Sequence, residues 1–255
     1  MKIPKLFIKI FCLFIPIKSL RRKIRTKYIK MQTPFIIHPK AASHPHSMKK
    51  FVDIVNRSTN INVKNIFEIG ANYGQDAKGL QHYFNLKEKD VWVFEAHPEI
   101  CKEIKILYPE FNIFDNAVFN KNQNMTFNIV DLENNSGVSS LRNNDNFKTT
   151  RKTTIEAIRM DGFMKDHSIE SVDFLKLDVE GCNYEVLEGF GERLKDVKCL
   201  HIEAEHRICW KKQKLYKDIE KILKSNGFEM LFFERYITQS DSFWVQKRYL
   251  KQKSI

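Results

Sequence analysis

Residues 66–74 read Ile-Phe-Glu-Ile-Gly-Ala-Asn-Tyr-Gly, an apolar run with one acid that ends in a turn with two glycines. An apolar strand that ends in a glycine turn and leads into a helix is how a doubly wound α/β sheet opens its ligand site. The glycines are Gly70 and Gly74, and the acid Glu68 stands two positions before the first of them. The pattern therefore predicts a parallel sheet whose first strand borders a nucleotide-like ligand.

The acid in this motif discriminates between ligands. In the Gly-x-Gly-x-x-Gly motif of dinucleotide-binding proteins, bare backbone N–H groups hold a diphosphate. A carboxylate such as Glu68 repels phosphate but suits a cationic ligand without phosphates. S-adenosylmethionine carries an ammonium, a sulfonium and no phosphate. The motif thus favours this cofactor and disfavours an NAD-dependent dehydrogenase or epimerase.

The remaining chain alternates strand-like and helix-like segments. Apolar or alternating runs predict strands at 64–69, 91–94, 112–114, 117–119, 125–130, 153–158, 172–177, 199–202, 228–233 and 242–246. Helical spacing predicts helices at 48–55, 75–83, 97–107, 183–194 and 210–225. This order predicts an α/β fold with a mostly parallel sheet and helices on both faces.

Acids stand at the carboxyl ends of four of these strands, at Glu68, Glu95, Asp178 and Glu203. In a parallel sheet those ends meet at the rim where ligands bind. Glu95 follows Gly70 by 25 residues and can accept hydrogen bonds from a ribose diol. Asn116, after the third strand, is expected to border the adenine.

A second acidic pair lies at 178–180, between a buried strand and a helix. Asp178 and Glu180 can hold the methionine ammonium, orient an acceptor hydroxyl or bind a cation, or they can simply cap the helix. Asp178, Glu203 and Glu205 form a candidate Mg²⁺ site. His206, three residues past Glu203, is a candidate general base beside the catalytic candidates Asp178 and Glu180.

Several of these segments together resemble one family. Residues 67–74 and 175–181, followed by Val-Leu-Glu-Gly at 186–189, are similar to motifs of the FkbM family of S-adenosylmethionine-dependent methyltransferases. Further similar segments lie in order at 94–98, 116–118, 136–141 and 158–163. The resemblance covers about residues 48–248 and leaves both basic ends outside it.

The resemblance implies a Rossmann-like class I methyltransferase with a mostly parallel seven-stranded sheet. It implies O-methylation of a hydroxyl on a sugar or polyketide and does not fix the substrate. Our leading hypothesis is a hydroxyl of a sugar, glycan or glycolipid precursor, while a nucleic-acid methyltransferase and an inactive binding module remain alternatives. By matching position, the cofactor-binding residues are Glu68, Gly70, Asn72, Gly74, Glu95, Ala96, Asn116, Ala117 and Asp178. Asp178 and Glu180 are implied to lie near the transferred methyl group.

The chain has a net charge of +12, and the excess of basic residues that causes it lies at the two ends of the chain. Residues 1–30 hold ten Lys or Arg and no acid, residues 247–255 hold four and no acid, and the rest is slightly acidic. An acidic body argues against a nucleic-acid partner. The apolar run 6–17 is short of the roughly 20 residues that span a bilayer. Its apolar and basic character predicts a surface contact with an anionic membrane through residues 1–30. Packing of this segment on the domain or on a second subunit is the alternative.

These observations predict a basic and apolar extension with a linker at 1–47, a catalytic domain at 48–248 and a basic tail at 249–255. The expected location is the cytoplasm, at the inner face of the membrane. The five cysteines fit no metal-binding spacing and are expected to be reduced thiols. The acceptor, the metal dependence and the oligomeric state are left open by the sequence.

Overall fold

The structure is a computed structural model that describes residues 35, 38–41, 43–130, 137–144 and 149–252. The chain divides into two compact units, Met1–Pro39 and Lys40–Ile255, and the second carries all the features described below. The run 6–17 and the predicted membrane contact of residues 1–30 lie outside the described residues, as does the end of the basic tail. Within the described part, no helix has the length and apolar character to cross a bilayer.

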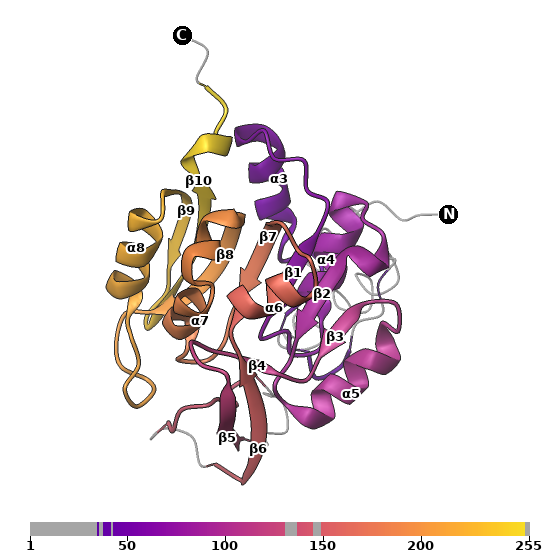
Figure 1. Cartoon of the computed structure of the whole chain (residues 1–255), viewed down its shortest axis with the longest axis vertical. Helices are drawn as coiled ribbons and strands as arrows, with labels where there is room; N and C mark the ends of the chain where they lie inside the picture. Colours follow the sequence, from indigo (N-terminus) through magenta and orange to yellow (C-terminus); the bar gives the residue numbers. More distant parts are fainter. Residues whose placement is uncertain (1–34, 36–37, 42, 131–136, 145–148, 253–255) are drawn as a thin grey trace, which may run out of the picture. The chain divides into compact units, whose positions relative to one another are not determined.

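The main sheet has seven strands in the order β3-β2-β1-β7-β8-β10-β9 (Figure 1). Their bounds are β1 (Ile66–Ile69), β2 (Val91–Phe94), β3 (Asn112–Phe114), β7 (Val172–Leu177), β8 (Val197–Glu205), β9 (Phe228–Arg235) and β10 (Gln239–Gln246). The pairs from β3 to β8 are parallel, whereas β10 runs antiparallel to both β8 and β9. The predicted seven-stranded, mostly parallel sheet is confirmed. Its strand order reverses between β1 and β7, which is where such sheets bind ligands.

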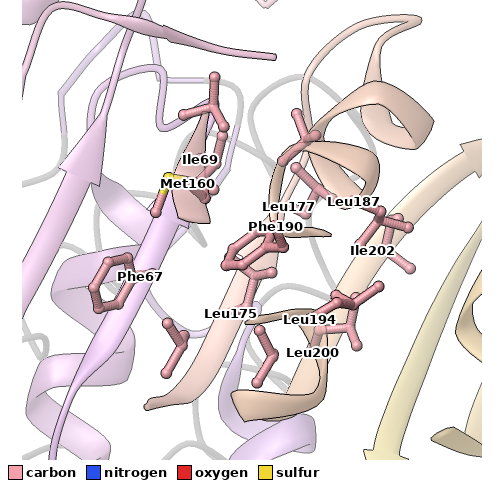
Figure 2. Packing of buried hydrophobic residues seen from close by; sticks show 14 of the residues in the cluster. Phe67, Ile69, Met160, Leu175, Leu177, Leu187, Phe190, Leu194, Leu200 and Ile202 are labelled. Atoms are coloured by element: carbon pink, nitrogen blue, oxygen red, sulfur yellow. The ribbon is translucent and has the colours of Figure 1, made fainter. Parts of the chain in front are cut away.

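Helices cover both faces of this sheet, as the sequence predicts. The helices α6 (Met160–Asp166), α7 (Asn183–Gly189) and α8 (Tyr216–Ser225) pack on one face. The helices α3 (Lys49–Ser58), α4 (Gln75–Phe84) and α5 (Pro98–Leu107) pack on the other. Figure 2 shows the first core, where Phe67, Leu175 and Leu200 from three neighbouring strands meet Phe190 and Leu194. Two apolar layers thus hold the strand ends in fixed positions.

The face toward α3 and α4 carries a buried polar row across the centre of the sheet. Strand register pairs Glu68 with Lys176 and Lys176 with His201. These residues are only 1%, 5% and 3% exposed. Alternation along each strand turns these polar side chains away from the leucine-rich core of Figure 2. Polar groups in the middle of a sheet cost stability, so their position points to a function.

A second, three-stranded sheet stands apart from the first, with the order β4-β6-β5. It consists of β4 (Ala117–Val118), β5 (Gln123–Ile129) and β6 (Arg151–Ile158). It has its own small core around Phe127, Ile129, Ile155 and Ala157. The sequence predicts these strands but not their separation, because apolar alternation does not specify which strand is the partner.

The structure corrects two predicted helices and adds one that was not predicted. The helix predicted at 210–225 begins at Tyr216, because Trp210 turns inward to pack on Val130 and Val138. The helix predicted at 183–194 ends at Gly189, and a 3₁₀ turn (Gly191–Asp196) follows from Gly191 at φ +51°. The short helix α6 was missed, since seven residues that include a glycine give a weak helical pattern.

Candidate active site

A cavity of about 780 Å³ lies at the carboxyl ends of the central strands. Its walls come from the turn after β1, the end of β2, the residues after β7, the end of β8 and the start of β10. The three-stranded sheet and residues 137–141 close another side, and residues 43–48 border it as well. A cavity of this size, where the strand order reverses, is the expected place for a cofactor and a second substrate.

Glu95 is fixed at the end of β2 by the neighbouring backbone. Its Oε2 accepts the N–H of Asn72 at 2.6 Å, and its Oε1 accepts the N–H of His97 at 2.8 Å. Burial raises the pKa of this carboxyl group to about 7, while the two backbone N–H groups act in the opposite direction. Each oxygen can still accept a hydrogen bond from the cavity, so Glu95 is an oriented acceptor for two neighbouring hydroxyl groups.

The turn after β1 is tightly packed against the end of β7. Gly70 has φ +80°, and a Cβ atom there would lie 2.0 Å from the backbone oxygen of Asp178. Its N–H donates to Phe94 O, and the N–H of Asp178 donates to Ile69 O. Only glycine fits this conformation and this approach. Gly70 therefore brings the turn, Glu95 and Asp178 to one edge of the cavity.

Lys176 neutralises a group of acids at the base of the cavity. Its Nζ lies 3.0 Å from Asp178, 3.6 Å from Asp76 and 3.9 Å from Glu68. Burial opposes its charge, but these acids raise the pKa of Lys176 above its ordinary value. Burial also raises the pKa of Glu68. One fixed ammonium thus orients Asp178 toward the cavity from beneath.

More carboxylates line the far side of the cavity. Burial, followed by repulsion from Asp178, raises the pKa of Glu180 and raises that of Glu203 to about 8. Burial raises the pKa of Glu205 as well. Glu203 accepts a hydrogen bond from Gln239 Nε2 at 2.6 Å. This region has strong acceptors, and Lys176, the one lysine among the described lining residues, is already paired with acids.

Of the residues predicted to bind the cofactor, the following line the cavity: Gly70, Asn72, Glu95, Ala96, Asn116, Ala117 and Asp178. Glu68 lies beneath the turn, where its Oε2 accepts the N–H of Ala77 at 2.8 Å in the first turn of α4. Gly74 is the left-handed residue before α4 and packs against α5. Glu68 and Gly74 therefore shape the turn without bordering the cavity.

The three catalytic candidates are placed differently. Asp178 and Glu180 line the cavity, and His206 does not. The ring of His206 packs on Tyr216 at 4.9 Å, and its backbone N–H donates to Thr238 O. Burial and nearby Arg235 lower the pKa of His206.

Several polar residues that line the cavity were given no role from the sequence, among them His44, His201 and Asp241. His201 is buried within β8, and Asp241 lies on the antiparallel β10 beside it. A histidine inside the apolar run 199–202 was the available signal. His44 lies in the proline-containing segment that sequence reasoning treated as a linker.

In the described part of the chain, no group of three or more His, Cys, Asp or Glu side chains is arranged to hold a metal ion. The structure thus gives Asp178, Glu203 and Glu205 no shared metal-binding geometry. Among the described residues, Cys101, Cys182, Cys199 and Cys209 carry free thiols.

A mostly parallel sheet closed by an antiparallel hairpin, with an acid-edged cavity at its strand ends, defines a class I methyltransferase fold. Over residues 68–230 the sequence matches the family described as Methyltransferase FkbM domain. That range is more than half of the chain, and the protein therefore belongs to the FkbM family of S-adenosylmethionine-dependent methyltransferases. No curated protein matches the sequence.

Solved structures with a similar fold have low sequence identity. A methyltransferase FkbM from Methylobacillus flagellatus KT is 14% identical with a TM-score of 0.47, and the match covers 71% of this chain and 44% of that one. Magnesium protoporphyrin IX methyltransferase from Synechocystis PCC 6803 is 11% identical with a TM-score of 0.45 and coverages of 88% and 95%. A S-adenosylmethionine-dependent methyltransferase from Clostridium acetobutylicum ATCC 824 is 10% identical with a TM-score of 0.43 and coverages of 89% and 98%. The chain spans less than half the length of the Methylobacillus protein.

Proposed function

We propose that the protein transfers the methyl group of S-adenosylmethionine to a hydroxyl group of a sugar, glycan or glycolipid precursor. The observation that carries this proposal is Glu95, whose two oxygens are fixed by backbone N–H groups at the edge of the cavity. Two oriented acceptors on one carboxylate match the two hydroxyl groups of a ribose.

The residues around Glu95 fit S-adenosylmethionine better than a dinucleotide. Glu95 and Asp178 both present carboxylates to the cavity, and carboxylates repel a diphosphate but attract an ammonium. Glu95 would hold the ribose, and Asp178 would face the methionine end. The adenosine would lie among Asn72, Ala96, Asn116 and Ala117.

Bound S-adenosylmethionine supplies an electrophilic methyl group on a good leaving group. The task of the chain is then to align the acceptor oxygen and to exclude competing water. Lys176 holds Asp178 from below, so that this carboxylate stays in one orientation at the cavity edge. Glu180 lies two residues further on and lines the same cavity.

The polar groups of the remaining cavity favour an acceptor with several hydroxyls. Glu203, Glu205, Gln239 and Asp241 offer carboxylate and amide oxygens, which accept hydrogen bonds from a polyol. Among the described lining residues the one lysine, Lys176, is already paired with acids, so these residues offer a polyanion no free cation, which disfavours the nucleic-acid alternative. An inactive binding module is disfavoured because Gly70, Glu95 and Asp178 are all in place.

Calorimetric titration tests the cofactor first. S-adenosylmethionine and NAD are titrated into the wild type and into Glu95→Ala. We expect binding of S-adenosylmethionine only, and weaker binding by the variant. Absence of S-adenosylmethionine binding by the folded wild type would overturn the proposal. Methyl transfer is then followed as S-adenosylhomocysteine formation with a panel of neutral sugars and glycolipids, against RNA as the competing acceptor.

We also propose that residues 1–30 bind an anionic membrane, at whose surface the protein would meet its acceptor. Sedimentation with vesicles that contain an acidic phospholipid tests it, with the chain lacking residues 1–30 as the comparison. Equal sedimentation of both proteins would contradict the contact.

A further inference from the structure

The cavity wall contains a histidine that is held by an aspartate from a neighbouring strand. His201 Nε2 lies 3.1 Å from Asp241 Oδ1. The other oxygen of Asp241 accepts a hydrogen bond from Tyr236 at 3.1 Å. His201 is 3% exposed, and both His201 and Asp241 line the cavity. The ring is further fixed by Phe51 of α3, whose centroid lies 4.4 Å away.

This contact assigns the proton on the imidazole ring. A carboxylate only accepts hydrogen bonds, so Nε2 must carry the proton that Asp241 receives. Nδ1 of the neutral ring then has a free lone pair. Nδ1 is buried and makes no hydrogen bond with any described residue. Buried ring nitrogens are normally paired. His206 Nε2 is also buried without a described partner, but His201 belongs to the cavity lining and His206 does not, so a ligand in the cavity can supply the missing donor to His201.

The groups around the ring can stabilise a positive charge on it. Register places His201 beside Lys176, whose ammonium is already paired with Asp178. Asp241 is held on one side by Tyr236. Burial acts to raise the pKa of Asp241, but its hydrogen bonds with His201 and Tyr236 and nearby positive charge lower that pKa below its ordinary value. Its negative charge therefore stabilises an imidazolium at His201 when a proton arrives.

From this geometry we propose that His201 is the general base that deprotonates the acceptor hydroxyl, and that Asp241 is its positioning residue. The inference rests on the proposed function. The acceptor oxygen forms its bond to the methyl carbon, and the carbon–sulfur bond breaks with its electron pair remaining on sulfur. The hydroxyl proton passes to Nδ1 of His201. Asp241 keeps the proton on Nε2 and stabilises the resulting imidazolium.

This proposal replaces His206, the histidine that sequence reasoning selected. His206 lies outside the cavity lining, whereas His201 is part of it. General-base catalysis contributes roughly 10²–10⁴-fold to a rate. We therefore expect His201→Gln to lower kcat by at least about 10²-fold with little change in KM for the acceptor. Binding of S-adenosylmethionine is expected to stay within about threefold of wild type, because Glu95 and its partners are untouched.

A spectroscopic measurement tests the dyad without any acceptor. Long-range ¹H–¹⁵N NMR of the full chain at pH 8 reports which nitrogen of His201 carries the proton. We expect the Nε2–H form in the wild type and a loss of that preference in Asp241→Asn. An Nδ1–H ring in the wild type would overturn the proposal. His82→Gln, on the surface of α4, is the matched control and is expected to leave the His201 signal unchanged.

The kinetic outcomes separate this inference from the proposed function. Failure of the wild type to bind S-adenosylmethionine would remove the proposed function itself. Normal cofactor binding with a kcat for His201→Gln close to wild type would overturn the dyad alone. A loss of kcat in His206→Gln but not in His201→Gln would also overturn the proposed role of His201 and Asp241. A drop in kcat for His201→Gln, with a smaller drop for Asp241→Asn at unchanged acceptor KM, would support it.

Discussion

The Oε2 atom of Glu95 accepts the backbone N–H of Asn72 at 2.6 Å. This bond joins the turn after β1 to the end of β2, in addition to the backbone hydrogen bonds that Gly70 and Ala71 donate to Phe94 O. Asn72 itself has φ +51°, a conformation that an L-residue adopts only when its surroundings hold it there. The cofactor turn and its carboxylate therefore form one rigid unit.

Glu95→Gln is expected to weaken S-adenosylmethionine binding by about 10- to 100-fold, since hydrogen bonds to a charged group contribute about 1.5–3 kcal/mol. The amide keeps the shape of the side chain but loses its charge and one acceptor. Calorimetry measures the dissociation constant. Glu110→Gln, an exposed glutamate beyond α5, is the control. Equal affinity in Glu95→Gln and wild type would contradict the role of Glu95.

Cofactor affinity should depend on pH through the same residue. The pKa of Glu95 in the free protein is raised to about 7, and the cofactor's hydroxyl donors prefer its ionised form. Binding should therefore tighten as the pH rises from about 5.5 to 8, with proton release near pH 7. Titrations in two buffers with different ionisation enthalpies measure that release. A pH dependence that persists unchanged in Glu95→Gln would assign it to another group.

The free energy of unfolding of the ligand-free protein should fall as the pH rises over part of the same range. Burial raises the pKa of Glu203 to about 8 from an ordinary 4.5. The contribution of Glu203 to the free energy of unfolding is thus fully present below about pH 4.5 and is lost as the pH rises through 8. Glu203→Gln should be more stable than wild type at pH 8, by about 1–3 kcal/mol, and nearly equal at pH 4.5. Urea unfolding at both pH values gives the comparison.

Gly70→Ala and Gly162→Ala form a matched pair. A Cβ at Gly70 would meet Asp178 O at 2.0 Å, whereas a Cβ at Gly162 in α6 has no atom within 4 Å. Strain and overpacking should cost Gly70→Ala about 2–5 kcal/mol and abolish cofactor binding. Gly162→Ala should be neutral or up to about 1 kcal/mol more stable, because alanine favours a helix. Thermal melts and calorimetry check both.

Lys176→Met should destabilise the protein by about 3–5 kcal/mol at pH 8, because it leaves buried acids without their cation. Adding Glu68→Gln to Lys176→Met should recover part of the loss, since one of those charges is then removed. Urea unfolding of the single and double variants measures the recovery. A double variant less stable than Lys176→Met would show that Glu68 is not the group left uncompensated.

Features that depend on residues close together in the sequence could be predicted. The apolar strands and the acids that follow them are local patterns, so the main sheet and the position of Glu95 could be predicted. The His201–Asp241 contact could not, because it depends on β10 returning antiparallel to β8. The start of α8 at Tyr216 was likewise hidden, since it depends on Trp210 packing against residues far back in the chain.

The three-stranded sheet has a core of its own, yet it forms one side of the cavity. Substitutions in β5 or in residues 137–141 can therefore reshape that side while the main sheet keeps its packing. Selection for a new acceptor and selection for folding then act on different parts of the chain. A fold organised in this way can change its substrate without first losing its stability, which suits a family whose members share a methyl donor.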